Sequence, residues 1–237
     1  MKICVITTSH GQLGDTGRKT GTWLEELAVP YYIFKDAGAG MTLASPLGGR
    51  IPIDPKSESI IASTSATRRF QKDLEVADWL AHSIPLTAVN AVNFDMAFLP
   101  GGYGAIWDFA DNDPLIQVLD DFSRQNKIIG LLSYGAVALT SMKTFEGEPF
   151  VKGKDLTAFS STEETVAGLA DIIPFSLESR LLASNAYYSK AANYICHTIV
   201  CGKMVTGQNP GSAAEVAKKM LALLKEARRN DPISQPY

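Results

Sequence analysis

The sequence predicts an α/β fold in which a doubly wound, mostly parallel sheet is sandwiched by helices. Short apolar runs alternate along the chain with helical segments, which is typical of parallel strands joined by crossover helices. The run Ile128–Leu132 contains no polar side chain, as expected of a strand buried on both faces. At 237 residues the chain fits one domain spanning 1–237, with loop excursions at about 10–21 and 46–65.

The predicted strands are short apolar stretches, beginning at the N-terminus. Near the C-terminus, Cys201-Gly202 is expected to join two strands as a hairpin. The predicted strands lie within 1–9 and at 41–45, 95–99, 128–132, 156–159, 194–200 and 203–206.

Capping residues and apolar spacing predict the helices between these strands. Pro30 is expected to interrupt or kink the first helix. Asp113 (followed by Pro114), Ser161 and Ser212 are the predicted N-caps of three later helices. The predicted helices cover 22–38, 65–80, 113–125, 135–139, 161–168, 174–183 and the stretch from 212 onward.

Composition and charge exclude several classes of protein. The net charge is −3 with acidic and basic residues interspersed, which argues against nucleic acid or an anionic membrane as the main partner. No apolar run approaches the ~20 residues of a membrane span, and the N-terminus reads as a strand rather than a signal peptide. The three cysteines (Cys4, Cys196 and Cys201) suit neither a disulfide framework nor a zinc site, so we expect a cytoplasmic protein.

Ser133 stands at the most informative junction in the chain. It separates the buried strand from the small-residue segment 135–139, and no turn dipeptide absorbs the change of direction. Such a sharp turn exposes a nucleophile at the carboxyl end of a parallel sheet, where amides and a helix N-terminus face a developing anion. The alternative is an ordinary strand–helix junction in which Ser133 is a helix N-cap.

Other polar or glycine-rich segments are expected at the same edge of the sheet. Ligands of doubly wound sheets bind beyond the carboxyl ends of the strands, where the topology places His10, Gly101-Gly102 and Ser133. The loop 9–21 matches neither a phosphate-binding loop nor a dinucleotide fingerprint, so no nucleotide or flavin cofactor is expected.

Five blocks of the sequence carry a family resemblance. They are Thr20-Gly21 with Glu26 and Pro30, Ala44-Ser45-Pro46 with Gly48-Gly49, Ile53-Asp54-Pro55 with Ser57, Phe98 to Gly104 with Asp108, and Val205 to Pro210. On these blocks the chain resembles the ThiJ/PfpI (DJ-one) superfamily, nearest its branch of stress-inducible chaperones and glutathione-independent glyoxalases. The resemblance implies a flavodoxin-like, class I glutamine amidotransferase-like fold and, from family habit, a homodimer.

The resemblance also implies a site built around a reactive cysteine in the elbow. In the family a glutamate of the first helix hydrogen-bonds that thiol, and a histidine usually follows the cysteine. Carried over by position, these residues are Glu26, Ser133 and Tyr134. A second family histidine position, in Gly-Gly-His-Gly, holds Tyr103.

The backbone of the site matches the family better than its side chains do. The amides of Gly102, beside Gly101, and of Tyr134 would form the oxyanion pocket, and Gly135 keeps its family identity. A thiol titrates near ~8.5 and can become a thiolate, whereas a serine hydroxyl needs a positioned base. Glyoxalase and deglycase activity are therefore expected to be weak or absent.

Three functional hypotheses follow. In the first, Glu26 and Ser133 perform hydratase-, lyase- or hydrolase-type acid–base chemistry on a small carbonyl or related electrophile, without metal or cofactor. Tyr103 and Tyr134 would then orient a substrate oxygen, or simply pack at the pocket lip. In the second, the protein is a non-catalytic holdase or small-molecule binding protein. In the third, it is a serine hydrolase with His10 as base.

Overall fold

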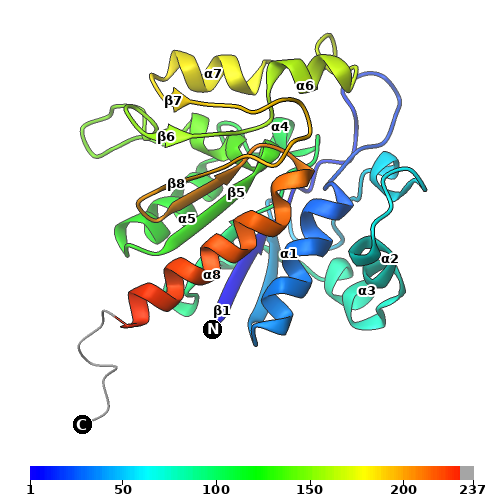
Figure 1. The fold of residues 1–237 in the computed structure, drawn as a ribbon, viewed down its shortest axis with the longest axis horizontal. Helices are drawn as coiled ribbons and strands as arrows, with labels where there is room; N and C mark the ends of the chain where they lie inside the picture. The colour runs from blue at the N-terminus through cyan, green and yellow to red at the C-terminus, as the bar shows by residue number, and fades with distance from the viewer. Residues whose placement is uncertain (230–237) are drawn as a thin grey trace.

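The fold is organised around a seven-stranded sheet with the order β3-β2-β1-β4-β5-β9-β8 (Figure 1). The computed structural model describes residues 1–229, so the remainder of the predicted 1–237 domain lies outside the described residues. The strands are β1 Lys2–Ile6, β2 Gly40–Ser45, β3 Ile84–Pro85, β4 Met96–Leu99, β5 Ile128–Leu132, β8 Thr198–Cys201 and β9 Met204–Gly207. Neighbouring strands are parallel except β8 and β9, which are antiparallel. The predicted α/β fold is confirmed.

Each face of the sheet carries its own hydrophobic core. Along β1, Ile3 and Val5 pack on one side and Cys4 and Ile6 on the other, as the two-residue period of a strand requires. The first core contains α1 and α8, which lie side by side in front of the sheet in Figure 1. The helices are α1 Leu24–Asp36, α2 Ser65–Lys72, α3 Leu74–Ala81, α4 Ala105–Asp108, α5 Asp113–Arg124 and α8 Ala213–Arg229.

A smaller layer lies across one end of the sheet, at the top of Figure 1. It consists of α6 Ser161–Val166, α7 Leu177–Ala183 and a parallel pair of two-residue strands, β6 Asp155–Leu156 and β7 Tyr187–Tyr188. The layer packs on the chain after β5, because α7 contacts the 3₁₀ segment Ser133–Thr140. This layer therefore forms one side of the region where β5 ends.

Two predictions of where a helix is interrupted were wrong. The helix expected over 65–80 is split at Asp73, whose carboxylate accepts a hydrogen bond from the Glu75 amide at 3.1 Å and caps α3. Conversely, α1 runs past Pro30 without interruption. The amide hydrogen bond that Pro30 lacks is offset by burial, since eight residues of α1, Pro30 included, are buried.

Several helix starts differ from prediction by one to three residues. The caps are Asn112 instead of Asp113 and Ser160 instead of Ser161, so the residue before the predicted cap takes the role in both cases. α7 begins at Leu177 rather than at 174, and α8 at 213, after a 3₁₀ turn. The Ser212 hydroxyl instead accepts from the His197 amide at 3.0 Å.

Two further segments are shorter or tighter than expected. The strand predicted over 156–159 is reduced to the two-residue strand β6, Asp155–Leu156. The helical segment predicted after Ser133 is a 3₁₀ helix rather than an α-helix. None of the described helices has the length and apolarity needed to cross a membrane.

Candidate active site

The chain turns sharply at Ser133, directly after β5. Ser133 has a φ of +54°, a left-handed conformation that non-glycine residues rarely adopt, and its side chain is buried. Leu132 occupies the N-cap position of the following 3₁₀ helix, and no side chain caps it. The alternative in which Ser133 is an ordinary N-cap is therefore wrong, and Ser133 sits in the strained turn typical of a nucleophile elbow.

Glu26, the third residue of α1, brings a buried carboxyl group to this turn. Its side chain is 1% exposed, and Oε2 accepts a hydrogen bond from the Gly101 amide at 2.7 Å. Burial raises the pKa of Glu26 to about 8, although hydrogen bonds from the Gly101 amide and from Ser133 lower it. At neutral pH the carboxyl is therefore mostly protonated and can either donate or accept a proton.

Gly101 permits the close approach of these groups. A Cβ at Gly101 would lie 2.5 Å from Glu26 Oε2 and 2.8 Å from the Cβ of Ser133. Gly102 follows with a φ of +122°, which only glycine adopts readily. The loop after β4 can thus reach the elbow only without side chains at these positions.

Two backbone amides near Ser133 are free to bind an anion. The Gly102 amide has no acceptor among the described residues, and Tyr134 is the second residue of the 3₁₀ helix, where an amide has no intrahelical partner. Gly135 follows against β4, and a Cβ there would collide with the Leu99 carbonyl. The arrangement offers the donors that an oxyanion pocket requires.

A pocket of about 420 Å³ opens over this group of residues. Glu26, Gly102 and Ser133 belong to its lining, which is otherwise largely apolar or aromatic. A larger hollow of about 670 Å³ lies elsewhere, between Asp120, Arg124 and other charged residues, and contains none of the predicted site residues. The smaller pocket is the candidate active site because it holds the perturbed carboxyl and the strained serine.

The two tyrosines lie in different places. Tyr103 lines the pocket, and burial raises its pKa well above the ordinary value, so its phenol remains a hydrogen-bond donor. Tyr134 is fully buried beneath the pocket, where its hydroxyl donates to Glu164 Oε1 at 3.3 Å. The structure therefore leaves only the Tyr134 amide, and not its side chain, near a substrate.

No imidazole reaches Ser133 within residues 1–229. His10 Nε2 is 2.6 Å from the carbonyl oxygen of Gln12, and the ring stacks on Trp107 at a centroid distance of 5.1 Å. His197 Nε2 lies 2.9 Å from the Ser189 hydroxyl. The loop after β1 thus holds His10 away from the pocket, which removes the geometric support for a histidine-assisted hydrolase.

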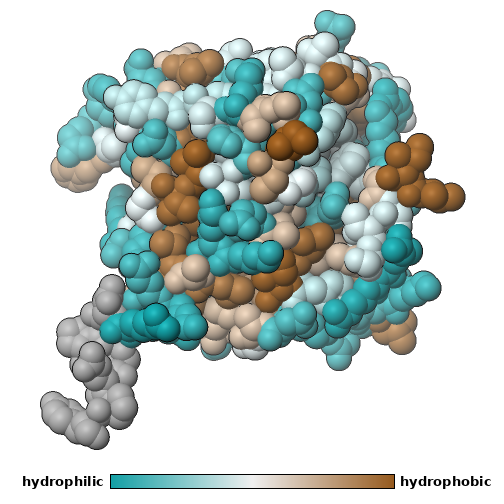
Figure 2. All heavy atoms as spheres, in the orientation of Figure 1, coloured by the Kyte–Doolittle hydropathy of each residue, from teal (hydrophilic) through white to brown (hydrophobic). Residues whose placement is uncertain are grey.

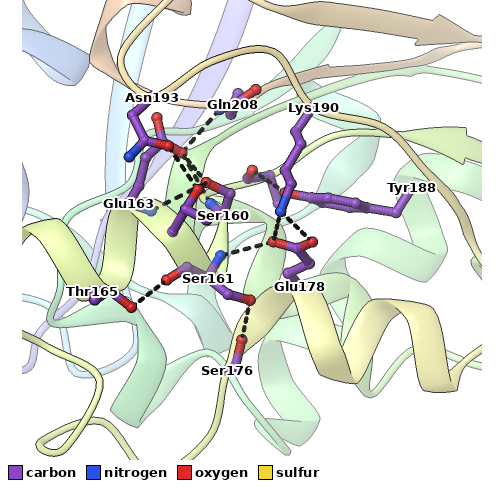
Figure 3. Close-up of polar contacts among 12 residues, drawn as sticks. Ser160, Ser161, Glu163, Thr165, Ser176, Glu178, Tyr188, Lys190, Asn193 and Gln208 are labelled. Atoms are coloured by element: carbon purple, nitrogen blue, oxygen red, sulfur yellow. Dashed lines mark hydrogen bonds and ion pairs between the residues drawn. The ribbon is translucent and has the colours of Figure 1, made fainter.

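Glu163 supports the site, although sequence reasoning did not assign it a role there. Its fully buried carboxyl group accepts from the Ser160 amide and hydroxyl at 3.0 and 2.8 Å and from Gln208 Nε2 at 3.1 Å (Figure 3). Its other oxygen accepts from the Tyr194 amide and from Asn209 Nδ2, both at 2.8 Å. Tyr194 lines the pocket, so Glu163 fixes part of the pocket wall.

The sequence did contain a signal for this network. Ser160-x-x-Glu163 is a capping box, and it was displaced by one residue in the prediction. The predicted Val205 to Pro210 block includes Gln208 and Asn209, which bind Glu163. What the sequence could not show is that these two segments meet.

Comparisons with known proteins show the family to which the sequence is similar. The model of the DJ-1/PfpI family matches residues 20–223. A glutathione-independent glyoxalase of Schizosaccharomyces pombe is 27% identical over 242 residues, covering 96% of this chain and 98% of the relative. One from Saccharomyces cerevisiae is 26% identical over 239 residues, covering 94% and 98%.

Solved structures show the same fold. The Rapid Encystment Protein 24 kDa of Francisella tularensis has a TM-score of 0.89 and 34% identity, with 94% of this chain and 98% of that chain covered. Glyoxalase III of Candida albicans has a TM-score of 0.86 and 22% identity, with 94% and 96% covered.

Proposed function

The chain belongs to the DJ-1/PfpI family, and from that premise we propose that it performs cofactor-free acid–base chemistry on a small carbonyl compound or related electrophile. The reaction would be of the hydratase, lyase or hydrolase type. The observation that carries the proposal is the buried Glu26 carboxyl, held by the Gly101 amide beside the strained Ser133 in the lining of a pocket.

The residues provide a complete path for one proton. Ionised Glu26 takes the Ser133 proton while Oγ forms a bond to the carbonyl carbon, and the π electrons of the carbonyl move to its oxygen. The Gly102 and Tyr134 amides would stabilise that oxyanion. Glu26 then returns the proton to the oxygen, leaving a neutral serine adduct from which water or an internal rearrangement continues the reaction.

We further propose that glyoxalase activity on methylglyoxal is weak. Relatives are named glutathione-independent glyoxalases, but the family resemblance assigns their reactive cysteine to the position of Ser133. A thiol near pKa ~8.5 ionises at a modest cost, whereas the serine hydroxyl loses its proton only as it attacks. The site would therefore favour electrophiles more reactive than a hydrated aldehyde.

A holdase is the second candidate function. Ile60, Ile61 and Phe145 expose 93%, 100% and 99% of their side chains, which is unusual for large apolar residues. Figure 2 shows a protruding hydrophobic cluster beside the loop that precedes α2. Surfaces of this kind bind apolar segments of other proteins.

A substrate screen with matched variants separates the two functions. Wild type, Glu26→Gln and Ser133→Ala would be assayed against aldehydes, 2-oxoaldehydes and activated esters, with exposed His82→Gln as control. Activity lost in both site variants and kept in the control supports the enzyme. Absence of turnover in every protein, together with equal suppression of client aggregation by all four, would instead establish the holdase.

Location and assembly are proposals of the same kind. Cys4, Cys196 and Cys201 are all unpaired, which suits the reducing cytoplasm that we propose as the location. We propose a homodimer because homodimers are common in the superfamily, and sedimentation velocity would test this assembly.

A further inference from the structure

We propose that the pocket selects carbonyl substrates that carry an aryl arm, in preference to two- or three-carbon aldehydes. This inference rests on the proposed function, because it names the substrate class of that same site. It follows from how polar and apolar groups are distributed along the pocket.

Besides Lys56 and Ser59, the pocket is lined by a group of polar atoms around Ser133 that could act on a carbonyl. Glu26, Ser133 and the Gly102 amide lie together, since a Cβ on Gly101 would contact both side chains. The volume of about 420 Å³ falls within the range of roughly 300–1,000 Å³ in which proteins bind much larger ligands than a three-carbon aldehyde. A small aldehyde would leave most of this volume filled with water against apolar walls.

Four aromatic side chains, which we call the aromatic wall, also line the pocket, together with Ile61, Ala62 and Pro210. The aromatic wall consists of Trp23, Tyr103, Phe159 and Tyr194. Trp23 and Phe159 lie 5.6 and 6.4 Å from the ring of Tyr103, and the rings of Phe159 and Tyr194 are 6.4 Å apart. Tilted rings at these distances present faces and edges that suit a further aromatic ring.

The outer end of the aromatic wall is built into the fold. The Tyr194 amide is held by Glu163, which is itself fixed by Ser160 and Gln208. Earlier in the same segment, Lys190 Nζ lies 2.7 Å from a carboxylate oxygen of Glu178 (Figure 3). The wall is therefore preformed, and a ligand would bind it without ordering a loop.

An exposed isoleucine adds to the apolar lining of the pocket. Ile61 lines the pocket, yet its side chain is fully exposed. An arm extending from the carbonyl toward the opening would remove this apolar surface from water, which favours binding. Ile60, 93% exposed, is not part of the pocket lining.

Binding of unreactive ketones tests the inference without requiring turnover. Acetophenone and acetone would be titrated by saturation-transfer NMR against wild type, Ile61→Asn, Phe159→Leu and Ile60→Asn. We expect acetophenone to bind wild type at least about tenfold more tightly than acetone, and Ile61→Asn and Phe159→Leu each to weaken acetophenone roughly three- to tenfold. Ile60→Asn should bind both ketones as wild type does.

The result that overturns the inference is equal affinity for the two ketones, or the same loss in Ile60→Asn as in Ile61→Asn. These binding outcomes can be told apart from failure of the proposed acid–base reaction. If acetophenone binds as expected but no carbonyl compound is turned over, the selectivity of the pocket for aryl ligands holds and the proposed function fails. If methylglyoxal and phenylglyoxal are converted with equal kcat/KM, the chemistry holds and the substrate class fails.

Discussion

Glu26 Oε2 and the Gly101 amide are joined by a hydrogen bond of 2.7 Å that fixes a buried carboxyl group beside Ser133. The bond links the first turn of α1 to the loop after β4, two segments that lie 75 residues apart in the sequence. Because the Gly101 amide occupies Oε2, that oxygen acts as an acceptor in both protonation states. The proton of Glu26 is therefore carried more readily by the other carboxyl oxygen than by Oε2.

The first prediction concerns activity against pH. If ionised Glu26 is the base, kcat/KM should rise with pH and level off above about 8, the pKa of this carboxyl. Measurement of kcat/KM between pH 5 and 9.5 would give that value. In Glu26→Gln this rise should disappear along with most of the activity, and a rise that persisted there would assign the titration to another group.

The second prediction concerns stability against pH. The pKa of Glu26 is raised from 4.5 to about 8 in the folded protein, so the folded state binds more protons than the unfolded state between these values. The contribution of this group to the free energy of unfolding is therefore fully present below pH 4.5 and is lost as pH rises through 8. At about 1.4 kcal/mol per pKa unit, the contribution amounts to several kcal/mol at most.

Urea denaturation at pH 5, 6.5 and 8 would measure this trend. Wild type should lose more stability than Glu26→Gln over this range, since glutamine has no proton to release. Parallel curves for the two proteins would show that Glu26 does not titrate in this window.

The third prediction is a gain of function in Ser133→Cys. Cysteine fits the same turn because its size and branching match those of serine, and an elbow thiol near a helix N-terminus and free amides can ionise. Methylglyoxal turnover should increase by at least about tenfold over wild type. Ser133→Ala is the control and should show none; a cysteine variant no better than alanine would mean that the environment cannot support a thiolate.

Sequence reasoning anticipated the frame of this site better than its side chains. The buried run Ile128–Leu132 and the turn at Ser133 are visible as a local pattern, because a strand buried on both faces and a sharp junction both depend on adjacent residues. The direction in which a long side chain points depends on residues that are distant in the sequence. Tyr134 follows Ser133 in sequence but points into the core toward Glu164.

Loop residues and long-range contacts were the remaining errors. His10 was expected near Ser133 at the carboxyl ends of the strands, but contacts with Gln12 and Trp107 hold its ring away from the pocket. The contact between Glu163 and Tyr194 joins residues that only the tertiary fold brings together. Helix caps failed by one residue because adjacent polar residues, such as Ser160 and Ser161, compete for the same role.

The fourth prediction concerns Gly101→Ala. The added methyl group would lie 2.5 Å from Glu26 Oε2 and 2.8 Å from the Cβ of Ser133, so both groups must move. Displacement of reacting groups by about 1 Å can cost roughly 100-fold in rate, and we expect a loss of kcat/KM of that order. Gly40→Ala is the control, since its Cβ would meet only the Met1 carbonyl at 4.0 Å; equal activity of the two variants would contradict the prediction.

The fifth prediction tests the buried carboxyl group of Glu163. Its two oxygens accept five hydrogen bonds, from Ser160, Gln208, Tyr194 and Asn209. In Glu163→Gln one oxygen becomes an NH₂ group, which must face donors whichever way the amide is turned. Unsatisfied buried donors should reduce the free energy of unfolding by about 2–4 kcal/mol, measured by urea denaturation.

The position of Tyr194 gives this variant a second readout. Loss of the acceptor for the Tyr194 amide should loosen the aromatic wall and weaken acetophenone binding as well as stability. Glu148→Gln is the matched control, because Glu148 is 54% exposed and pairs with Lys152 at the surface, where such a pair contributes less than about 1 kcal/mol. If the Glu163 and Glu148 variants lost equal stability and bound acetophenone equally well, Glu163 would have no role in holding the wall, and the rigidity of the pocket would need another source.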